Sequence, residues 1–432
     1  MSAGSPAAGA VAALVTDARR AAHGVAIEIG GQGIRFWSDD EGGIEVARTI
    51  LGPYCDIAAL DGPLPDGRPY RTSGAPYPPR WTVTSARVDG LPERIRALAD
   101  LLARSGLTPL TVKRWPGDFD AARYDLPSGW SVVIHDRPFT GLTIFCPDEC
   151  ELHYLRSDAA WDASHTEHVL KYPLRTTLRQ AGLAQVHAAG CVFGGRGLLI
   201  MGEKASGKST LLAHLMTTGA DQVSNDLSFV AVAGPAGPQM IAFPHITRMA
   251  PGTVGDNAAL RTGLATELRT GDYLRSPVFN GGKEEFYFPV LERIWGRNPI
   301  ARQVPLDAIL FPVLDLDCQA ASARPVAAAE RDERVRRSLV TDPPLPDWLP
   351  FLPASGFRAL AEAAADALLA SDPPAYEVHY GSGASDPARA IAQCLDIKCL
   401  DIKCLDIQCL DITAGTGQPL EPTPTAAAGG GS

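Results

Sequence analysis

The chain has 432 residues, of which 45% are hydrophobic and 20% charged, so it is long enough for two or three domains with buried cores. Its 39 basic and 49 acidic residues give a formal net charge of -10 without a local basic run, which argues against nucleic acid as a partner. No apolar stretch approaches the roughly 20 residues of a membrane helix, so we expect a cytoplasmic protein with no membrane partner.

Composition divides the chain into four segments. Residues 1–23 are rich in Ala, Gly and Ser and are expected to be a flexible leader, and residues 24–155 are expected to form a small α+β domain. A second, α/β domain is expected at 160–395, followed by a repetitive and disordered tail at 396–432. For the small α+β domain, the pattern predicts strands at 25–29 and 34–36, a Pro- and Gly-rich loop at 51–80, a strand at 81–88, a helix from Pro92 to Gly106 and a strand at 130–135.

The second domain alternates helical and strand patterns. It opens with a helix, and most of its predicted strands are short apolar runs of the kind that is buried in a sheet. Its elements are predicted, in chain order, as a helix at 167–182, strands at 186–193, 198–201, 223–232 and 308–314, and a helix that begins near Ser355.

The strongest motif lies between the strand at 198–201 and an amphipathic helix, and it matches the phosphate-binding loop (P-loop) pattern G-x-x-x-x-G-K-[ST]. Backbone N–H groups of such a loop and the N-terminus of its helix hold the β-phosphate of a nucleotide. Lys208 would neutralise phosphate oxygens, and the Ser209 hydroxyl would bind Mg²⁺, so ATP and Mg²⁺ are the expected cofactors. The alternative is a glycine-rich turn without a ligand. The predicted nucleotide-binding residues are Gly202, Glu203, Lys204, Ala205, Ser206, Gly207, Lys208, Ser209 and Thr210.

A P-loop indicates a nucleotide but not a reaction, and the acidic residues that follow it narrow the choice. A motor or transporter ATPase would add four apolar residues followed directly by Asp-Glu, and no Asp-Glu of this sequence follows such a run. Asp315 is the nearest imitation, but Pro312 interrupts its strand, and we interpret it as an acid at a strand end. Asp226, within Ser224-Asn225-Asp226, is the better candidate to face the phosphates, with a turn-forming role as the alternative.

The order of these motifs resembles the catalytic domain of HPr kinase/phosphorylase and its related kinases. The likeness consists of the run 187–190, a Gly-containing hairpin, the P-loop and Ser224-Asn225-Asp226, and it covers about residues 160–320. It implies an α/β fold in which a P-loop HPr-kinase-like catalytic domain, a mixed sheet flanked by helices, follows the small α+β domain. It also implies that His187 lies near the transferred phosphate and that Asp226 serves metal binding and proton transfer. This chain has Asn225 where the family has its first acid.

The resemblance implies an ATP-dependent kinase that transfers the γ-phosphate to a hydroxyl, with a serine of a protein or peptide as the expected acceptor. Because Asn225 cannot accept a proton, Asp226 or His187 would be the base, or the reaction would depend on positioning and charge neutralisation alone. The expected catalytic residues are Asp226, His187 and Lys208, and the expected metal ligands are Ser209 and Asp226. A nucleotide-sensing module without turnover and a kinase of a small metabolite stay open as alternatives, as does a homo-oligomer.

Three further patterns have no assigned role. The basic, Gly-rich run 275–283 is either a lid over phosphates or an ordinary surface loop. Cys146, Cys150 and His153 do not have the spacing of a common zinc site. A pentapeptide that begins Cys-Leu-Asp-Ile recurs four times over 394–413 and holds four of the nine cysteines, so the chain has no disulfide framework. The repeat is interpreted as an expansion of the last helix, a modified or partner-binding tail, or a thiolate metal cluster.

Overall fold

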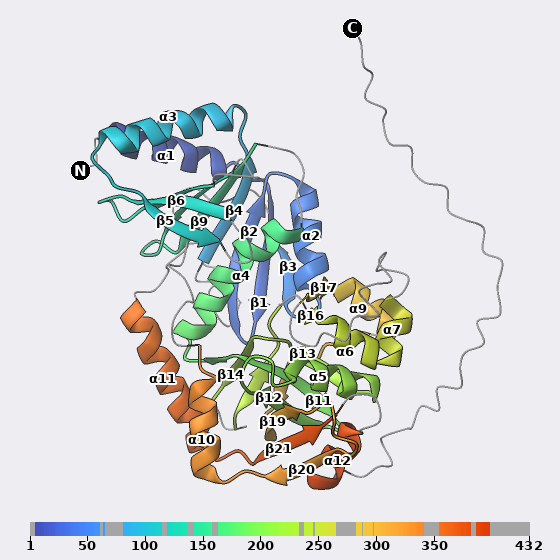
Figure 1. The fold of residues 1–432 in the computed structure, drawn as a ribbon. Helices are drawn as coiled ribbons and strands as arrows, with labels where there is room; N and C mark the ends of the chain where they lie inside the picture. The colour runs from blue at the N-terminus through green and yellow to red at the C-terminus, as the bar shows by residue number, and fades with distance from the viewer. Residues whose placement is uncertain are drawn as a thin grey trace, which may run out of the picture.

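The computed structural model describes residues 5–60, 64, 81–114, 119–135, 141–157, 163–232, 237–244, 247–264, 282–286, 288–296, 298–340, 354–381 and 386–397. These residues form a mixed α/β structure with sheets of nine, six, four and two strands. The nine-stranded sheet with its helices forms the upper part of the molecule in Figure 1, and the other sheets form the lower part. Within the described ranges, no helix has both the length and the apolar character needed to cross a membrane.

The upper part contains one sheet whose strands follow the order β3-β1-β2-β4-β9-β8-β7-β6-β5. Its elements are α1 (Pro6–Ala18), β1 (His23–Ile29), β2 (Gln32–Ser38), α2 (Glu41–Leu51), β3 (Asp56–Leu60), β4 (Trp81–Arg87), α3 (Leu91–Arg104), β5 (Leu110–Arg114), β6 (Phe119–Asp125), β7 (Ser131–His135), β8 (Gly141–Cys146) and β9 (Glu151–Arg156).

Helices cover both faces of this sheet. The strands expected at 25–29 and 34–36 are confirmed as β1 and β2, an antiparallel hairpin that turns at Gly30 and Gly31, both with positive φ. One face packs on α2 and α4 (Ala163–Gln180), and the other packs on α1 and α3 (Figure 1). The strand expected at 81–88 and the helix expected from Pro92 are confirmed as β4 and α3.

The expectation of a flexible leader at 1–23 is wrong for the residues that form α1. Ser5 caps this helix by accepting a hydrogen bond from the N–H of Ala8, and Pro6 occupies its first turn. The small apolar side chains at 7, 11, 14, 15 and 18 form one buried stripe against α3, β4 and β9. Low sequence complexity concealed an amphipathic helix, because Ala contributes to both faces.

The expectation of a loop over 51–80 is wrong for residues 56–60. Residues 56–60 form β3, which pairs antiparallel with β1, while 61–63 and 65–80 lie outside the described residues. The strand predicted at 223–232 is two strands in two different sheets, and Asn225, Asp226 and Leu227 separate them.

The lower part is built from two layers of sheet. The elements after α4 are β10 (Ala184–Val186), β11 (Ala188–Phe193), β12 (Arg196–Met201), α5 (Lys208–Thr217), β13 (Asp221–Ser224), β14 (Ser228–Ala231), β15 (Gln239–Ile241), β16 (Thr247–Met249), α6 (Pro251–Asp256), α7 (Ala258–Leu264), β17 (Glu284–Phe286), α9 (Phe288–Trp295), β18 (Gln303–Pro305), β19 (Ala308–Leu314), β20 (Ser322–Pro325), α10 (Ala328–Arg337), α11 (Ala354–Ala370), β21 (Ala375–Tyr380) and α12 (Pro387–Cys394).

The six-stranded sheet, in the order β13-β11-β12-β19-β21-β20, forms the centre of the lower part. Its strands β12, β19 and β21 are parallel neighbours, and the others pair antiparallel. Alternate residues of β12 face opposite sides: Leu198 and Ile200 pack with α5 and α12, whereas Leu199 and Met201 pack in the core that includes the four-stranded sheet β10-β14-β15-β18.

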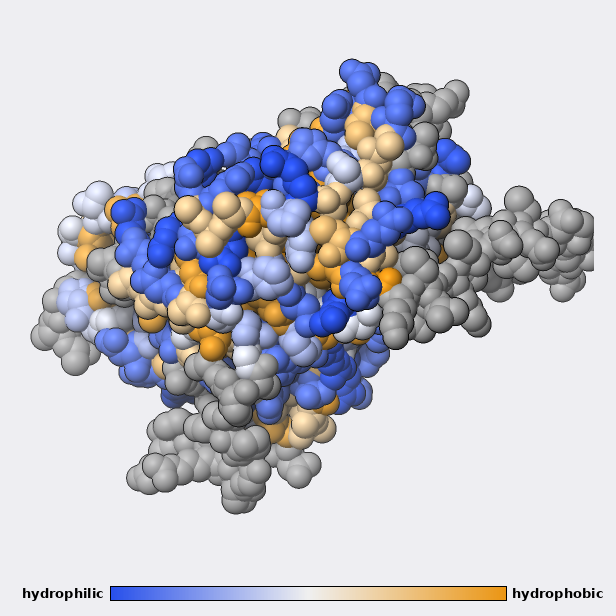
Figure 2. Space-filling view, turned by 90° about the horizontal axis from the view of Figure 1, so that it is seen from below, coloured by the Kyte–Doolittle hydropathy of each residue, from blue (hydrophilic) through white to orange (hydrophobic). Residues whose placement is uncertain are grey.

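The face of the lower part that is seen from below in Figure 2 mixes hydrophilic and hydrophobic residues. At the C-terminal end, Ile397 is buried beside α12, in the same cluster as the core of the six-stranded sheet. The rest of the pentapeptide repeat and the tail, 398–432, lie outside the described residues.

Leu14 provides a test of the role of α1, because its side chain is fully buried against the upper sheet. We expect Leu14→Ala to lower the free energy of unfolding by about 2 to 5 kcal/mol in urea titrations followed by circular dichroism. Thr16→Ala, on the exposed side of the same helix, is the control and should change it by less than about 0.5 kcal/mol. Equal, negligible effects of the two substitutions would contradict a packed α1.

Candidate functional site

The run 202–207 is the loop between β12 and α5, at the edge where the parallel strands of the central sheet end. Gly202 and Gly207 adopt φ values of 155° and 99°, in the region that favours glycine, at the two ends of this loop. A Cβ atom on Gly207 would lie 2.9 Å from the Cβ of Leu314 and would also collide with the Tyr380 hydroxyl. The P-loop predicted from the sequence is therefore folded as a tight turn that leads from strand to helix.

Lys208, the first residue of α5, is buried, with 8% of its surface exposed. Its Nζ donates hydrogen bonds to the carbonyl oxygens of Gly202 (2.8 Å) and Glu203 (2.9 Å). Burial lowers the pKa of Lys208 to about 8, while the negative charge of Asp226 opposes the shift and the positive charge of Lys283 adds to it. A further anion beside Nζ would stabilise the charged amine, so the site favours an anionic ligand.

Asn225 and Asp226 occupy the turn between β13 and β14, directly across from the start of α5. Asn225 is 1% exposed, and its Oδ1 lies 3.4 Å from the Ser209 hydroxyl, which donates to it. Asp226 has a φ of 69°, a left-handed conformation that is uncommon for residues other than glycine. This turn brings Asn225 and Asp226 close to Ser209, although Asn225 follows Ser209 by 16 residues in the chain.

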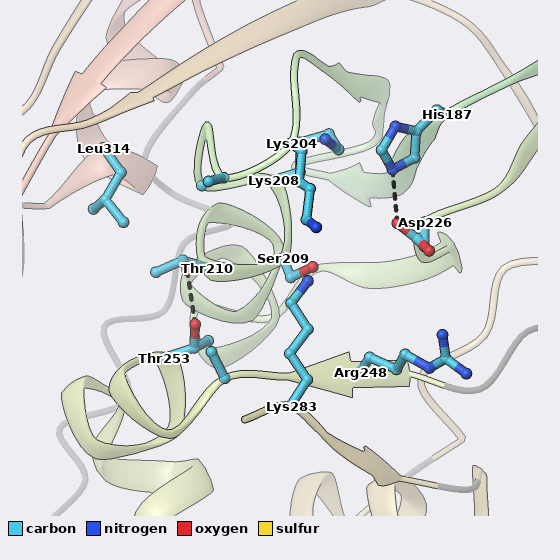
Figure 3. A pocket seen from close by; sticks show the side chains of 13 residues that line it. His187, Lys204, Lys208, Ser209, Thr210, Asp226, Arg248, Thr253, Lys283 and Leu314 are labelled. Carbon is cyan, nitrogen blue, oxygen red and sulfur yellow. Dashed lines mark hydrogen bonds and ion pairs between the residues drawn. The ribbon is translucent and has the colours of Figure 1, made fainter. Parts of the chain in front are cut away.

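His187 lies between β10 and β11, and its ring points toward the carboxylate of Asp226 (Figure 3). The His187 Nε2 and the Asp226 Oδ1 are 2.8 Å apart, and their side chains are 41% and 40% exposed. The backbone N–H of His187 donates to the carbonyl oxygen of Ser338 (2.8 Å), at the C-terminal end of α10. The structure thus brings together a histidine and an aspartate that are 39 residues apart in the chain.

These groups open on a cavity of about 500 Å³ whose basic side chains outnumber its acidic ones. Figure 3 shows Lys208 and Lys283 reaching into the same space from opposite sides, with His187 and Asp226 beside it. The lining contains four Lys or Arg side chains and a single carboxylate, that of Asp226, so the cavity suits a polyanion. Its lining consists of His187, Lys204, Ala205, Gly207, Lys208, Ser209, Thr210, Asp226, Arg248, Ala250, Thr253, Lys283 and Leu314.

The remaining predicted residues of the P-loop line a second cavity of about 530 Å³. Gly202, Glu203 and Ser206 border it, and it shares His187 and Lys204 with the first cavity. Glu203 contributes its carbonyl oxygen to Lys208, whereas its carboxylate is 81% exposed.

Two basic residues of the first cavity lie on or beside the paired strands β16 and β17; nothing in the sequence pattern indicated Arg248, whereas Lys283 ends the run that was expected to be a lid over phosphates or a surface loop. Arg248 lies on β16, and Lys283 directly precedes β17, the strand that pairs with it. Lys283 belongs to the run 275–283, of which Gly282 and Lys283 are described. Asp315, the alternative acid, is not among the lining residues of either cavity, and its Oδ1 instead accepts a hydrogen bond from the N–H of Asp317 (3.1 Å).

Oxygen atoms at the site suit Mg²⁺, which prefers oxygen ligands and keeps several waters or phosphate oxygens. The Ser209 hydroxyl and the Asp226 carboxylate both line the first cavity and would be the protein ligands of a nucleotide-bound Mg²⁺. The described residues contain no group of three His, Cys, Asp or Glu side chains that could hold a metal by themselves.

The Cys146, Cys150 and His153 pattern is part of the upper core. Both ring nitrogens of the fully buried His153 have partners, because Nδ1 is 2.8 Å from the Thr84 hydroxyl and Nε2 is 3.1 Å from Glu151. Such a histidine serves packing and hydrogen bonding.

No protein-family model matches this chain, and neither does any curated protein sequence.

The lowered pKa of Lys208 provides a direct test of the site. We expect NMR titration of labelled lysine to give a pKa near 8 for this amine. The variant Asp226→Asn should lower that pKa further, because it removes the negative charge that favours the protonated form. The variant Asp315→Asn is the control and should leave it unchanged, since Asp315 lies outside the cavity. An ordinary lysine pKa, or no response to Asp226→Asn, would contradict this electrostatic description.

Proposed function

We propose that the protein is an ATP-dependent kinase that transfers the γ-phosphate to a hydroxyl group. The observation that carries this proposal is the meeting of the P-loop, the His187–Asp226 pair and the cationic side chains at one cavity. A P-loop alone would be consistent with any nucleotide-binding protein. The histidine–carboxylate pair beside it adds a group that can take a proton from an attacking hydroxyl.

The nucleotide would be held by the backbone of the loop. The N–H groups of the turn and of the first residues of α5 would bind the β-phosphate, and the Lys208 amine would bridge the β- and γ-phosphates. Ser209 and Asp226 would hold a Mg²⁺ ion, which would neutralise phosphate charge when bound. Arg248 and Lys283, which line the same cavity, would neutralise further negative charge.

In the transfer step the acceptor oxygen forms a bond to the γ-phosphorus as the bond to the β–γ bridging oxygen breaks, and ADP leaves with that electron pair. The proton of the acceptor hydroxyl passes to the His187–Asp226 pair. A neutral His187 that donates its Nε2 proton to Asp226 leaves Nδ1 to accept this proton. Because the transition state of phosphoryl transfer is loose, early deprotonation is not required, and Asn225 in place of an acid is compatible with catalysis.

The order of motifs supports assigning residues 160–395 to the P-loop fold of HPr kinase/phosphorylase and related kinases. It also supports a serine or similar hydroxyl as the acceptor, either in a protein or in a small molecule. The six free cysteines among the described residues and the dependence on ATP support a cytoplasmic location.

A second function is favoured by one observation. Asn225 is buried beside Ser209, its Nδ2 has no hydrogen-bond partner within the described ranges, and it cannot act as a base. A module that binds Mg·ATP and changes its interactions without turnover would tolerate this substitution. Calorimetric binding of Mg·ATP without phosphate transfer or hydrolysis, with any acceptor fraction, would favour that function over a kinase.

The kinase proposal is tested by transfer of radiolabelled γ-phosphate from ATP into the protein and small-molecule fractions of a cell extract. We expect Lys208→Ala and Asp226→Asn each to reduce the rate at least 100-fold, an order of magnitude typical of lost transition-state contacts. Asp315→Asn is the matched control and should keep the activity to within about threefold, because its carboxylate bonds only locally. Unchanged transfer in both active-site variants, or the largest loss in Asp315→Asn, would contradict the assignment.

A further inference from the structure

The P-loop lies between the first cavity and the second cavity. The nucleotide site proposed above occupies the first cavity and gives the second cavity no role. Its walls come from the P-loop, β19, β21, the segment between β10 and β11, and the C-terminal end of α10. The residues that line it are His187, Gly202, Glu203, Lys204, Ser206, Phe311, Pro312, Val313, Arg334, Arg337, Ser338 and Glu377.

The two cavities meet at His187 and Lys204, which line both. His187 is also fixed to α10, because its backbone N–H donates to the carbonyl oxygen of Ser338, and Val186 forms a β-bridge with Leu339. Arg337 precedes Ser338 in the chain. The backbone that carries the Arg337 guanidinium is therefore hydrogen-bonded, one residue later, to the backbone of His187, the proposed base.

Arg334 is a fixed wall of the cavity. Its guanidinium forms an ion pair with Glu377 (2.6 Å), contacts Glu330 and lies 5.0 Å above the ring of Phe311. Glu377 is 5% exposed, and although burial raises its pKa, hydrogen bonds from Arg334, His379 and Arg324 lower the pKa to about 2. This carboxylate stays ionised and satisfied, so Arg334 is committed to it.

Arg337 differs from Arg334 in that both of its partners are exposed. It pairs with Glu333 one turn earlier on α10, and its Nη1 lies 3.7 Å from the Glu203 carboxylate. The side chains of Arg337, Glu333 and Glu203 are 57%, 61% and 81% exposed. Ion pairs between exposed side chains are weak and exchange readily, so Arg337 can turn to another anion at little cost.

We propose that the second cavity binds the phosphate acceptor, and that this acceptor carries a carboxylate that pairs with Arg337. The proposal rests on the proposed kinase function and names the chemistry of its substrate. The acceptor's carbon chain would lie on Phe311, Pro312 and Val313, and its hydroxyl would lie near His187, where the two cavities join. The cavity volume falls within the range of about 300 to 1,000 Å³ that holds small ligands.

Two sources present this chemistry, namely a free hydroxy acid and a serine flanked by acidic residues in a peptide. In either case Glu203 acts as an internal competitor, because its carboxylate occupies the place beside Arg337 that the carboxylate of the acceptor would take. This gives opposite expectations for the two members of one ion pair. Loss of Arg337 weakens acceptor binding, whereas loss of the Glu203 charge strengthens it.

The experiment compares γ-phosphate transfer to glycerate, to the peptide Ala-Asp-Ser-Asp-Ala, and to their uncharged analogues glycerol and Ala-Asn-Ser-Asn-Ala. We expect transfer to an acidic acceptor to exceed transfer to its uncharged analogue, and the preferred pair identifies the source. With the preferred acceptor, Arg337→Gln should raise its KM about 2- to 5-fold, the scale of an ion pair at a half-exposed arginine, and leave the KM for ATP unchanged. Arg337→Lys should restore part of this loss.

Arg336→Gln is the matched control, because Arg336 is a similarly exposed residue of α10 that pairs with Asp366 and lies outside the cavity. It should leave both KM values unchanged, and Glu203→Gln should lower the acceptor KM. Equal transfer to acidic and uncharged acceptors, or no transfer to either acidic acceptor, overturns the proposed acceptor site. A higher acceptor KM in both Arg337→Gln and Glu203→Gln also overturns it. Transfer to glycerol alone would still support the kinase, whereas binding of Mg·ATP without any transfer would remove both proposals.

Discussion

The buried amine of Lys208 is the constraint on which the site depends. A lysine at the start of α5 is held by two carbonyl oxygens of its own loop, which are dipoles and cannot neutralise its charge. The nearest carboxylate that opposes the lowered pKa is Asp226, which is also engaged by His187. The loop is therefore preorganised for an anion, and a phosphate group would supply the full negative charge that two neutral carbonyl oxygens lack.

The connection between α10 and His187 gives the molecule its second organising feature. One backbone hydrogen bond, from His187 to Ser338, links the centre of the proposed chemistry to a helix that brings arginines to the far side of the P-loop. The two cavities thus have a common wall at the P-loop and a common residue at His187. A donor on one side and an acceptor on the other would meet at the γ-phosphate, which is the arrangement that a transfer reaction needs.

Local signals in the sequence predicted part of this arrangement. The P-loop is contiguous, so its residues and the strand and helix around it could be identified from the sequence. Asp226 was named as the acid that follows the P-loop, and His187 was named through a resemblance in the order of motifs. Arg248 and Arg337 could not be named, because tertiary packing brings them to the two cavities from separate elements, whereas Lys283 belongs to the run 275–283 that was offered as a lid over phosphates. Strands such as β5, β6 and β8 were missed because their patterns are short or mixed, and α1 was missed because Ala dominates it.

If the Lys208 amine binds the phosphates of a nucleotide, its protonation state should change on binding, and proton uptake measures this change directly. At pH 8.5 an amine with a pKa of about 8 is mostly neutral, and a bound phosphate would raise that pKa, so Mg·ATP binding should take up protons. Calorimetry in buffers of different ionisation enthalpy reports this uptake. We expect the unaltered protein to take up protons when it binds Mg·ATP. The variant Lys208→Arg should take up none, because its guanidinium stays charged. Binding without proton uptake, or equal uptake by both proteins, would contradict the role of Lys208 in binding the phosphates.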